Sequence, residues 1–174
     1  MTLKRKNMYF QSKKANVFLD LMMVVLVLVG MAILGLVAQR MFTDLNADIQ
    51  ADPDLTPTMK STVQTMQTGF PTWMDNAFLF ATVLLWVFII VSSFVIDSHP
   101  AFFIISVILL IFGFSIVMML SNTFEEFALD DSYTGMEIDF PITYWIMGNL
   151  LPLAIVMGGS VLVTLYGKNK FIGV

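Results

Sequence analysis

The sequence predicts an all-α integral membrane protein with four transmembrane helices. Hydrophobic residues make up 57% of the 174 residues and charged residues only 13%, about half the charged share of an ordinary soluble domain. Four apolar runs are each long enough to cross the hydrocarbon core of a bilayer, which takes about 20 helical residues. Because these runs are continuously apolar, they do not match the alternating strands of a membrane barrel. A soluble fold built from them would lack a polar outer face.

The predicted spans cover residues 17–38, 77–96, 101–120 and 142–165. In the first span the uncharged core begins at Leu21, and the other three spans contain no charged residue. Only the residues at 97–100 separate the second span from the third, so these two spans form an antiparallel hairpin with a tight turn. The single histidine, His99, lies in this turn. We interpret it as a polar turn residue, with a role as a pH sensor or proton relay as the alternative.

The fourth span is the only one with marked irregularities. Asn149 and Pro152 interrupt it, and the proline leaves the carbonyl of residue 148 without its helical partner. We interpret Asn149 as a hydrogen-bonding residue between helices, because interhelical amides commonly serve that purpose. Ala154 and Gly158 form a small-xxx-small pair that permits close helix approach. These four residues are therefore predicted to serve helix packing.

Basic residues near the span ends predict the orientation, since they favour the cytoplasmic side. The tails at 1–16 and 166–174 carry seven of them: Lys4, Arg5, Lys6, Lys13, Lys14, Lys168 and Lys170. The loops at 39–76 and 121–141 carry only Arg40 and Lys60, but they hold eleven of the thirteen carboxylates. We therefore expect both termini on the cytoplasmic or interior side, with the basic tails in contact with anionic lipid or nucleic acid.

The first loop, at 39–76, is expected to contain a short amphipathic helix at 57–68. Thr56 and Pro57 are typical of a helix start, and Gly69 of a helix end. Met59, Val63 and Met66 recur at helical spacing, and Phe70 follows, so they form one apolar stripe. The stripe fits either a helix that rests on lipid or on its own bundle, or a docking surface for a protein partner.

The third loop, at 121–141, combines six carboxylates with aromatic residues, including Phe124, Phe127 and Tyr133. Its acidic residues do not have the spacing of an EF-hand, so no metal site is predicted. The aromatic residues are predicted to contact a partner, with packing at the membrane interface as the alternative.

The sequence indicates a protein without enzymatic activity. It has no nucleotide-binding glycine motif and no G-x-S-x-G motif, and it contains no cysteine. We predict no catalytic residue, cofactor or metal, and expect a lipid-embedded scaffold that links a membrane to a protein layer within a larger assembly. The alternative is a small holin-like or channel-forming protein. Such a protein would line a pore with the polar residues of the spans, namely Thr82, Ser92, Ser93, Ser106, Ser115, Asn149 and Thr164.

The stretch from Val95 to Phe103, VIDSHPAFF, together with the basic N-terminal tail and the short bundle-only body, resembles small integral membrane proteins of icosahedral viruses that enclose a membrane within a double-jelly-roll capsid. The resemblance implies that the basic residues from Lys4 to Lys14 face the packaged genome and that the acidic loops face capsid proteins. The same architecture also suits an accessory subunit of a cellular membrane complex.

Overall fold

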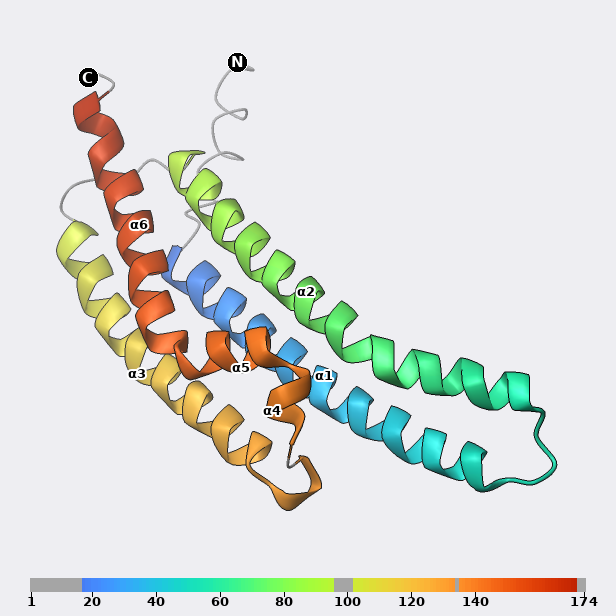
Figure 1. Cartoon of the computed structure of the whole chain (residues 1–174). Helices are drawn as coiled ribbons and strands as arrows, with labels where there is room; N and C mark the ends of the chain where they lie inside the picture. The colour runs from blue at the N-terminus through green and yellow to red at the C-terminus, as the bar shows by residue number, and fades with distance from the viewer. Residues whose placement is uncertain (1–16, 96–101, 134, 172–174) are drawn as a thin grey trace, which may run out of the picture.

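The computed structural model describes residues 17–95, 102–133 and 135–171, and every regular element among them is helical (Figure 1). The main helices are α1 (Val17–Ala51), α2 (Pro57–Val95), α3 (Phe102–Ala128), α5 (Pro141–Gly148) and α6 (Leu150–Phe171). A 3-10 turn, η1 (Asp131–Tyr133), and the one-turn helix α4 (Met136–Asp139) connect α3 to α5. The predicted tail at 1–16 and the predicted tight turn at 97–100 lie outside the described residues.

Within the described part of the chain, four helices are long and apolar enough to cross a membrane, by length and composition. The qualifying segments are Leu19–Ala51, Pro57–Phe94, Ile104–Ala128 and Leu150–Gly167. This confirms the predicted all-helical architecture with four helices of spanning length and apolarity.

The bundle is built around α1, which packs against α2 and α3, while α6 packs against the same two helices (Figure 1). The buried core takes Val25, Leu28 and Leu36 from α1, Phe78 from α2 and Met147 from α5. Large apolar side chains on the outer faces of α2 and α3 are exposed instead. This distribution suits helices whose surroundings are lipid, because hydrocarbon tails accept apolar side chains as readily as a protein core does.

The first loop differs from its predicted form, because most of it is helical and continuous with the spans. α1 has 35 residues and α2 has 39, so at 1.5 Å per residue they are about 52 and 58 Å long. The hydrocarbon core is only about 30 Å thick. The helix predicted at 57–68 is the first part of α2, which continues through Gly69 and the buried Pro71. Packing against α1 offsets the loss of helix stability that Gly69 and Pro71 cause.

The fourth predicted span is divided into α5 and α6 at Asn149, whose backbone angles are φ −110° and ψ 22°. The amide of Asn149 donates a hydrogen bond to the carbonyl oxygen of Trp145 at 2.8 Å. The bond is therefore local to α5, where we had expected one to another helix. Pro152 falls in the first turn of α6, where a missing N–H costs little.

The small residues of α6 lie where helices approach closely. Ala154 is buried. A Cβ atom placed on Gly158 would be 2.8 Å from Cδ1 of Leu110 on α3. Gly158 thus allows the leucine side chain to lie directly against the α6 backbone.

Candidate functional site

The most distinctive feature of the molecule is a two-helix projection, which we call the arm. It consists of residues 39–72, namely the C-terminal part of α1, the connecting turn and the N-terminal part of α2. In Figure 1 the arm extends past the ends of α3, α5 and α6, at the lower right. It arises because α1 and α2 are both longer than a bilayer requires.

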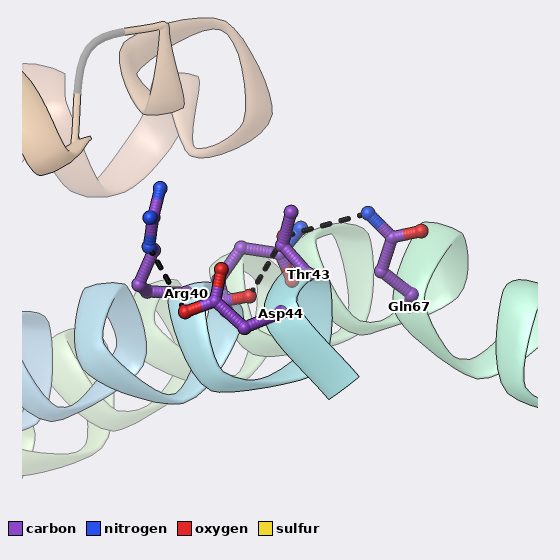
Figure 2. A network of polar contacts seen from close by, with 5 residues as sticks. Arg40, Thr43, Asp44 and Gln67 are labelled. Carbon is purple, nitrogen blue, oxygen red and sulfur yellow. Dashed lines mark hydrogen bonds and ion pairs between the residues drawn. The ribbon is translucent and has the colours of Figure 1, made fainter. Parts of the chain in front are cut away.

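Polar side chains hold the two helices of the arm together. The amide nitrogen of Asn46 donates to Oε1 of Gln67 at 3.0 Å, and Nε2 of Gln67 donates to Oγ1 of Thr43 at 3.4 Å (Figure 2). Near the tip, Nζ of Lys60 donates to the carbonyl oxygen of Gln50 at 3.0 Å, and Nε2 of Gln50 donates to the carbonyl oxygen of Lys60 at 2.9 Å. The Gln50 carbonyl lies in the last turn of α1, where carbonyls have no partner within the helix.

The predicted apolar stripe of the arm is divided between two environments. The ring of Phe70 packs against Phe42 of α1, with centroids 5.0 Å apart, and Val63 is half-buried. Met59 and Met66 are 48% and 58% exposed. Each step of four residues turns a helix about 40° beyond one full turn, so Val63 and Phe70 occupy the edge of the stripe that faces α1. Part of the predicted docking stripe therefore packs within the chain, and the two methionines lie on its open side.

The two helices of the arm carry different charges. The α1 side and the tip present Asp44, Asp48, Asp52 and Asp54, all exposed. Arg40 pairs with Asp44 at 3.2 Å on this face (Figure 2), and such exposed pairs contribute only about 0–1 kcal/mol.

The α2 side of the arm has Lys60 as its only charged residue up to residue 74. Its exposed hydroxyl groups donate to carbonyl oxygens of their own helix, as in the bonds from Thr62 to Thr58 and from Thr65 to Ser61, both 2.9 Å. The arm thus has an acidic α1 face and a largely uncharged α2 face.

A buried carboxylate joins the base of the arm to the bundle. Asp75 of α2 is 3% exposed and accepts hydrogen bonds from the backbone N–H groups of Ile142 at 2.9 Å and Thr143 at 2.7 Å. The hydroxyl of Thr143 donates to the same carboxylate at 2.7 Å. The first N–H groups of a helix have no partner within it, and Pro141 supplies none. Asp75 therefore caps α5 from another helix, and we call this arrangement the Asp75 latch.

Sequence reasoning missed the latch, because Asp75 was counted only among the charges of the acidic loop. The available signal was a carboxylate two residues before the apolar run that begins at Ala77. Such a position is close enough to the bundle for burial. The partner segment, at residues 141–143, is too distant in sequence to be identified from spacing.

Gln39 adds a second buried polar group at the base of the arm. Gln39 is 3% exposed, and its Oε1 is the one buried side-chain nitrogen or oxygen atom of the described residues without a hydrogen-bond partner. Gly35 of α1 lies beside Met74 of α2, because a Cβ atom placed on Gly35 would be 3.3 Å from the Met74 side chain. Asp75 follows Met74 directly, and Gln39 is four residues after Gly35. Gln39 therefore lies about one helical turn from the latch, on the side of the arm's tip. Gln39, Asp75 and Thr143 thus form a buried polar layer at the base of the arm.

The aromatic residues of the acidic segment at 121–141 pack mainly within the chain. Phe124 is 3% exposed, and its ring meets that of Tyr144 edge-on at 5.6 Å, so it is not a free partner contact. Phe127 packs against Tyr133 with centroids 4.6 Å apart. These residues therefore pack against other residues of the same chain.

Tyr144 of α5 precedes α6 and connects the acidic segment to α5. Burial raises the pKa of its hydroxyl above the ordinary value, and the negative charge of Glu137 adds to that rise. The hydroxyl donates a long hydrogen bond, 3.4 Å, to the carbonyl oxygen of Ala128. Among the residues that the structure describes, no group of three or more acidic or histidine side chains could hold a metal ion.

The polar residues named as a possible pore lining hydrogen-bond mainly within the chain. Thr82 and Ser93 are buried and donate to carbonyl oxygens four residues earlier, at 2.8 and 2.7 Å. Ser106 of α3 lies 3.2 Å from the hydroxyl of Tyr166 on α6. Thr164 donates to the carbonyl oxygen of Ser160 at 2.8 Å. Ser115 is exposed.

The predicted basic contacts Lys4, Arg5, Lys6, Lys13 and Lys14 lie outside the described residues, and Lys168 and Lys170 belong to the end of α6.

Comparison with protein-family models, with curated proteins and with solved structures finds no match for this chain.

Proposed function

We propose that the protein is a non-enzymatic membrane scaffold, which links a lipid bilayer to a protein layer through its arm. The observation that carries this proposal is the length of α1 and α2, 35 and 39 residues, combined with the hydrogen bonds that hold them as one projecting unit. A polar projection on an apolar bundle suits contact with another protein. The Asp75 carboxylate at its base is engaged in three hydrogen bonds, an arrangement that favours a structural role over a reactive one.

The charge distribution supports an orientation with both termini on the cytoplasmic or interior side. In this orientation the basic tails contact anionic lipid or nucleic acid, and each Lys or Arg near an anionic surface contributes about 1 kcal/mol. The arm and the acidic segment lie on the opposite side and contact capsid proteins of a virion or subunits of a membrane complex.

The orientation is tested by labelling single cysteines, because the chain contains none of its own. A membrane-impermeant maleimide is added to sealed, right-side-out vesicles from the expressing cells. It is expected to label Thr62→Cys directly and Ser12→Cys only after the vesicles are permeabilised. Labelling of both from one side would overturn the orientation.

The scaffold role is tested by changing the charge of the arm. The four aspartates Asp44, Asp48, Asp52 and Asp54 are replaced together by asparagine, and a matched control replaces them by glutamate. If the acidic face binds the protein layer, the asparagine variant inserts normally but loses its co-purifying proteins in mild detergent, while the glutamate variant retains them. Retention by both variants would contradict an electrostatic contact.

A pore-forming role is separated by electrical measurement. Purified protein in planar bilayers is expected to give no single-channel currents. Reproducible currents would overturn a purely structural role.

A further inference from the structure

The three tryptophans of the chain lie in two different environments. Trp73 of α2 and Trp145 of α5 are 71% and 61% exposed, and within the described part of the chain neither indole N–H has a hydrogen-bond partner. Trp86 of α2 is half-buried and donates to Oγ of Ser160 on α6 at 3.1 Å. An indole N–H that leaves water needs an acceptor from the protein, because hydrocarbon supplies none. The contrast indicates that Trp86 lies in hydrocarbon, and that the other two indoles lie where their surroundings supply acceptors.

The Asp75 latch brings the two exposed tryptophans to one level of the molecule. Trp73 precedes Asp75 by two residues. Trp145 follows Thr143 by two residues, and the backbone N–H of Thr143 donates to the Asp75 carboxylate at 2.7 Å. Each tryptophan is therefore only about 3 Å from the latch along the axis of its own helix. Both indoles belong to the base of the arm.

The uncharged part of the bundle ends close to this level. On α2 no charged residue follows Asp75 up to the end of the helix at Val95, and on α1 none lies between Asp20 and Arg40. Each of these stretches is about 30 Å long. This length equals the thickness of the hydrocarbon core, which is also about 30 Å.

Contacts between the helices align the ends of these uncharged stretches. Gly35 of α1 lies beside Met74 of α2, so Arg40 is within about two helical turns of the latch. On α3 the ring of Phe124, the last residue before the first carboxylate of that helix, meets Tyr144 of α5 at 5.6 Å. The base of the arm is therefore one boundary of an uncharged layer that several helices share.

The exposed side chains of α2 also change character at Trp73. On the side of the tip they are mainly polar, and on the side of the bundle they are mainly apolar; examples are Gln64, Thr65 and Thr68 before it, and Leu79, Phe80 and Val83 after it. An indole suits such a boundary, because its ring is apolar and its N–H is a hydrogen-bond donor. Tryptophan is accordingly enriched where a membrane meets water.

We propose that Trp73 and Trp145 anchor the protein in the lipid headgroup layer, on the side of the membrane where the arm projects. The Asp75 latch then lies at the edge of the hydrocarbon core, and the arm lies in water. Two indoles on different helices, held at one level by the latch, oppose movement of the bundle along the membrane normal and so fix the height of the arm. This placement depends neither on the scaffold role nor on which side of the membrane carries the arm.

Depth-dependent fluorescence quenching tests the placement. Each of three variants retains one tryptophan, while the other two are changed to phenylalanine (two of Trp73→Phe, Trp86→Phe and Trp145→Phe). The variants are reconstituted without other proteins into phosphatidylcholine vesicles that carry a nitroxide either on the lipid headgroup or near the end of the acyl chain. We expect the ratio of headgroup to chain-end quenching to be several-fold higher for Trp73 and Trp145 than for Trp86, which lies about 20 Å from Trp73 along α2. Since the ratio compares two quenchers of the same indole, it is insensitive to how far the protein shields that indole.

A second measurement keeps all three tryptophans. Met66→Cys and Phe80→Cys change exposed positions that lie seven residues to either side of Trp73, on the same face of α2. The chain has no other cysteine. In the same vesicles, a membrane-impermeant maleimide present on both sides of the membrane is expected to label Met66→Cys and not Phe80→Cys.

Three results would overturn the placement. The first is a quenching ratio at Trp73 or Trp145 as low as that at Trp86, which moves the edge of the hydrocarbon core into the arm. The second is a lack of quenching of these two indoles by either lipid, which moves the edge into the bundle. The third is labelling of both cysteines or of neither. Binding of a protein layer by the acidic face of the arm is decided separately, by the co-purification of the aspartate variants.

Discussion

Replacing Asp75 by alanine is expected to release α5 from the base of the arm. The carboxylate is 3% exposed and accepts three hydrogen bonds of 2.7 to 2.9 Å. Its removal leaves two N–H groups and one hydroxyl without a partner in a buried place. A hydrogen bond to a charged group contributes about 1.5–3 kcal/mol, and the three are not additive, so we expect Asp75→Ala to lower the free energy of unfolding by about 3–5 kcal/mol.

Two smaller substitutions at the latch are expected to lower the free energy of unfolding by less than Asp75→Ala does. Asp75→Asn keeps one oxygen for the two donors of Thr143, but its amide opposes the N–H of Ile142, so the expected loss is about 2 kcal/mol. Thr143→Val removes only the hydroxyl donor and is expected to cost about 1–2 kcal/mol. In the Asp75→Ala background the valine change is expected to cost almost nothing, because the hydroxyl has already lost its acceptor.

The assay is equilibrium unfolding in mixed detergent micelles, followed by the circular dichroism of the helices. The control is Asp48→Ala on the exposed face of α1, which is expected to change stability by no more than about 0.5 kcal/mol. The reasoning is refuted if Asp75→Ala behaves like this control. It is also refuted if Thr143→Val costs the same with and without the aspartate.

Two further predictions use matched neighbours as controls. Gly158→Ala places a Cβ atom 2.8 Å from Cδ1 of Leu110, whereas the Cβ atom of Gly159→Ala meets nothing within 4 Å. Unfolding measurements should therefore show the Gly158 variant to be about 1 kcal/mol less stable than the Gly159 variant. Equal stabilities would contradict the close contact. Gln67→Ala removes both of its hydrogen bonds to α1, so amide exchange should accelerate in the arm but not in the bundle, while the exposed Gln64→Ala leaves both rates unchanged.

The architecture could be predicted from the sequence because lipid imposes a simple rule. A helix that crosses hydrocarbon must be apolar for about 20 residues, and the four runs satisfy that rule without reference to anything distant in the chain. α2 also begins at Pro57, where Thr56 and Pro57 predicted a helix start. Local signals sufficed for these features, since both depend on residues close together in sequence.

The continuity of α2 could not be predicted, because it depends on a distant helix. Gly69 and Pro71 are locally typical of a helix end, but residues on α1 pack alongside them, as the ring contact of Phe42 with Phe70 illustrates. Tertiary packing of this kind routinely overrides local propensity. The interruption at Asn149 was visible in the sequence, but its form was not, because an asparagine can bond equally well to its own helix or to another.

The chemistry of the arm follows from where it lies. Inside the bundle apolar contacts predominate, and the hydroxyls of Thr82 and Ser93 turn back to their own helices. In the arm, polar side chains specify the register of the two helices. Gln67 specifies it by bonding to both Asn46 and Thr43, since a shift by one residue would break both bonds at once. An arm with a fixed register presents its outer residues at fixed spacing.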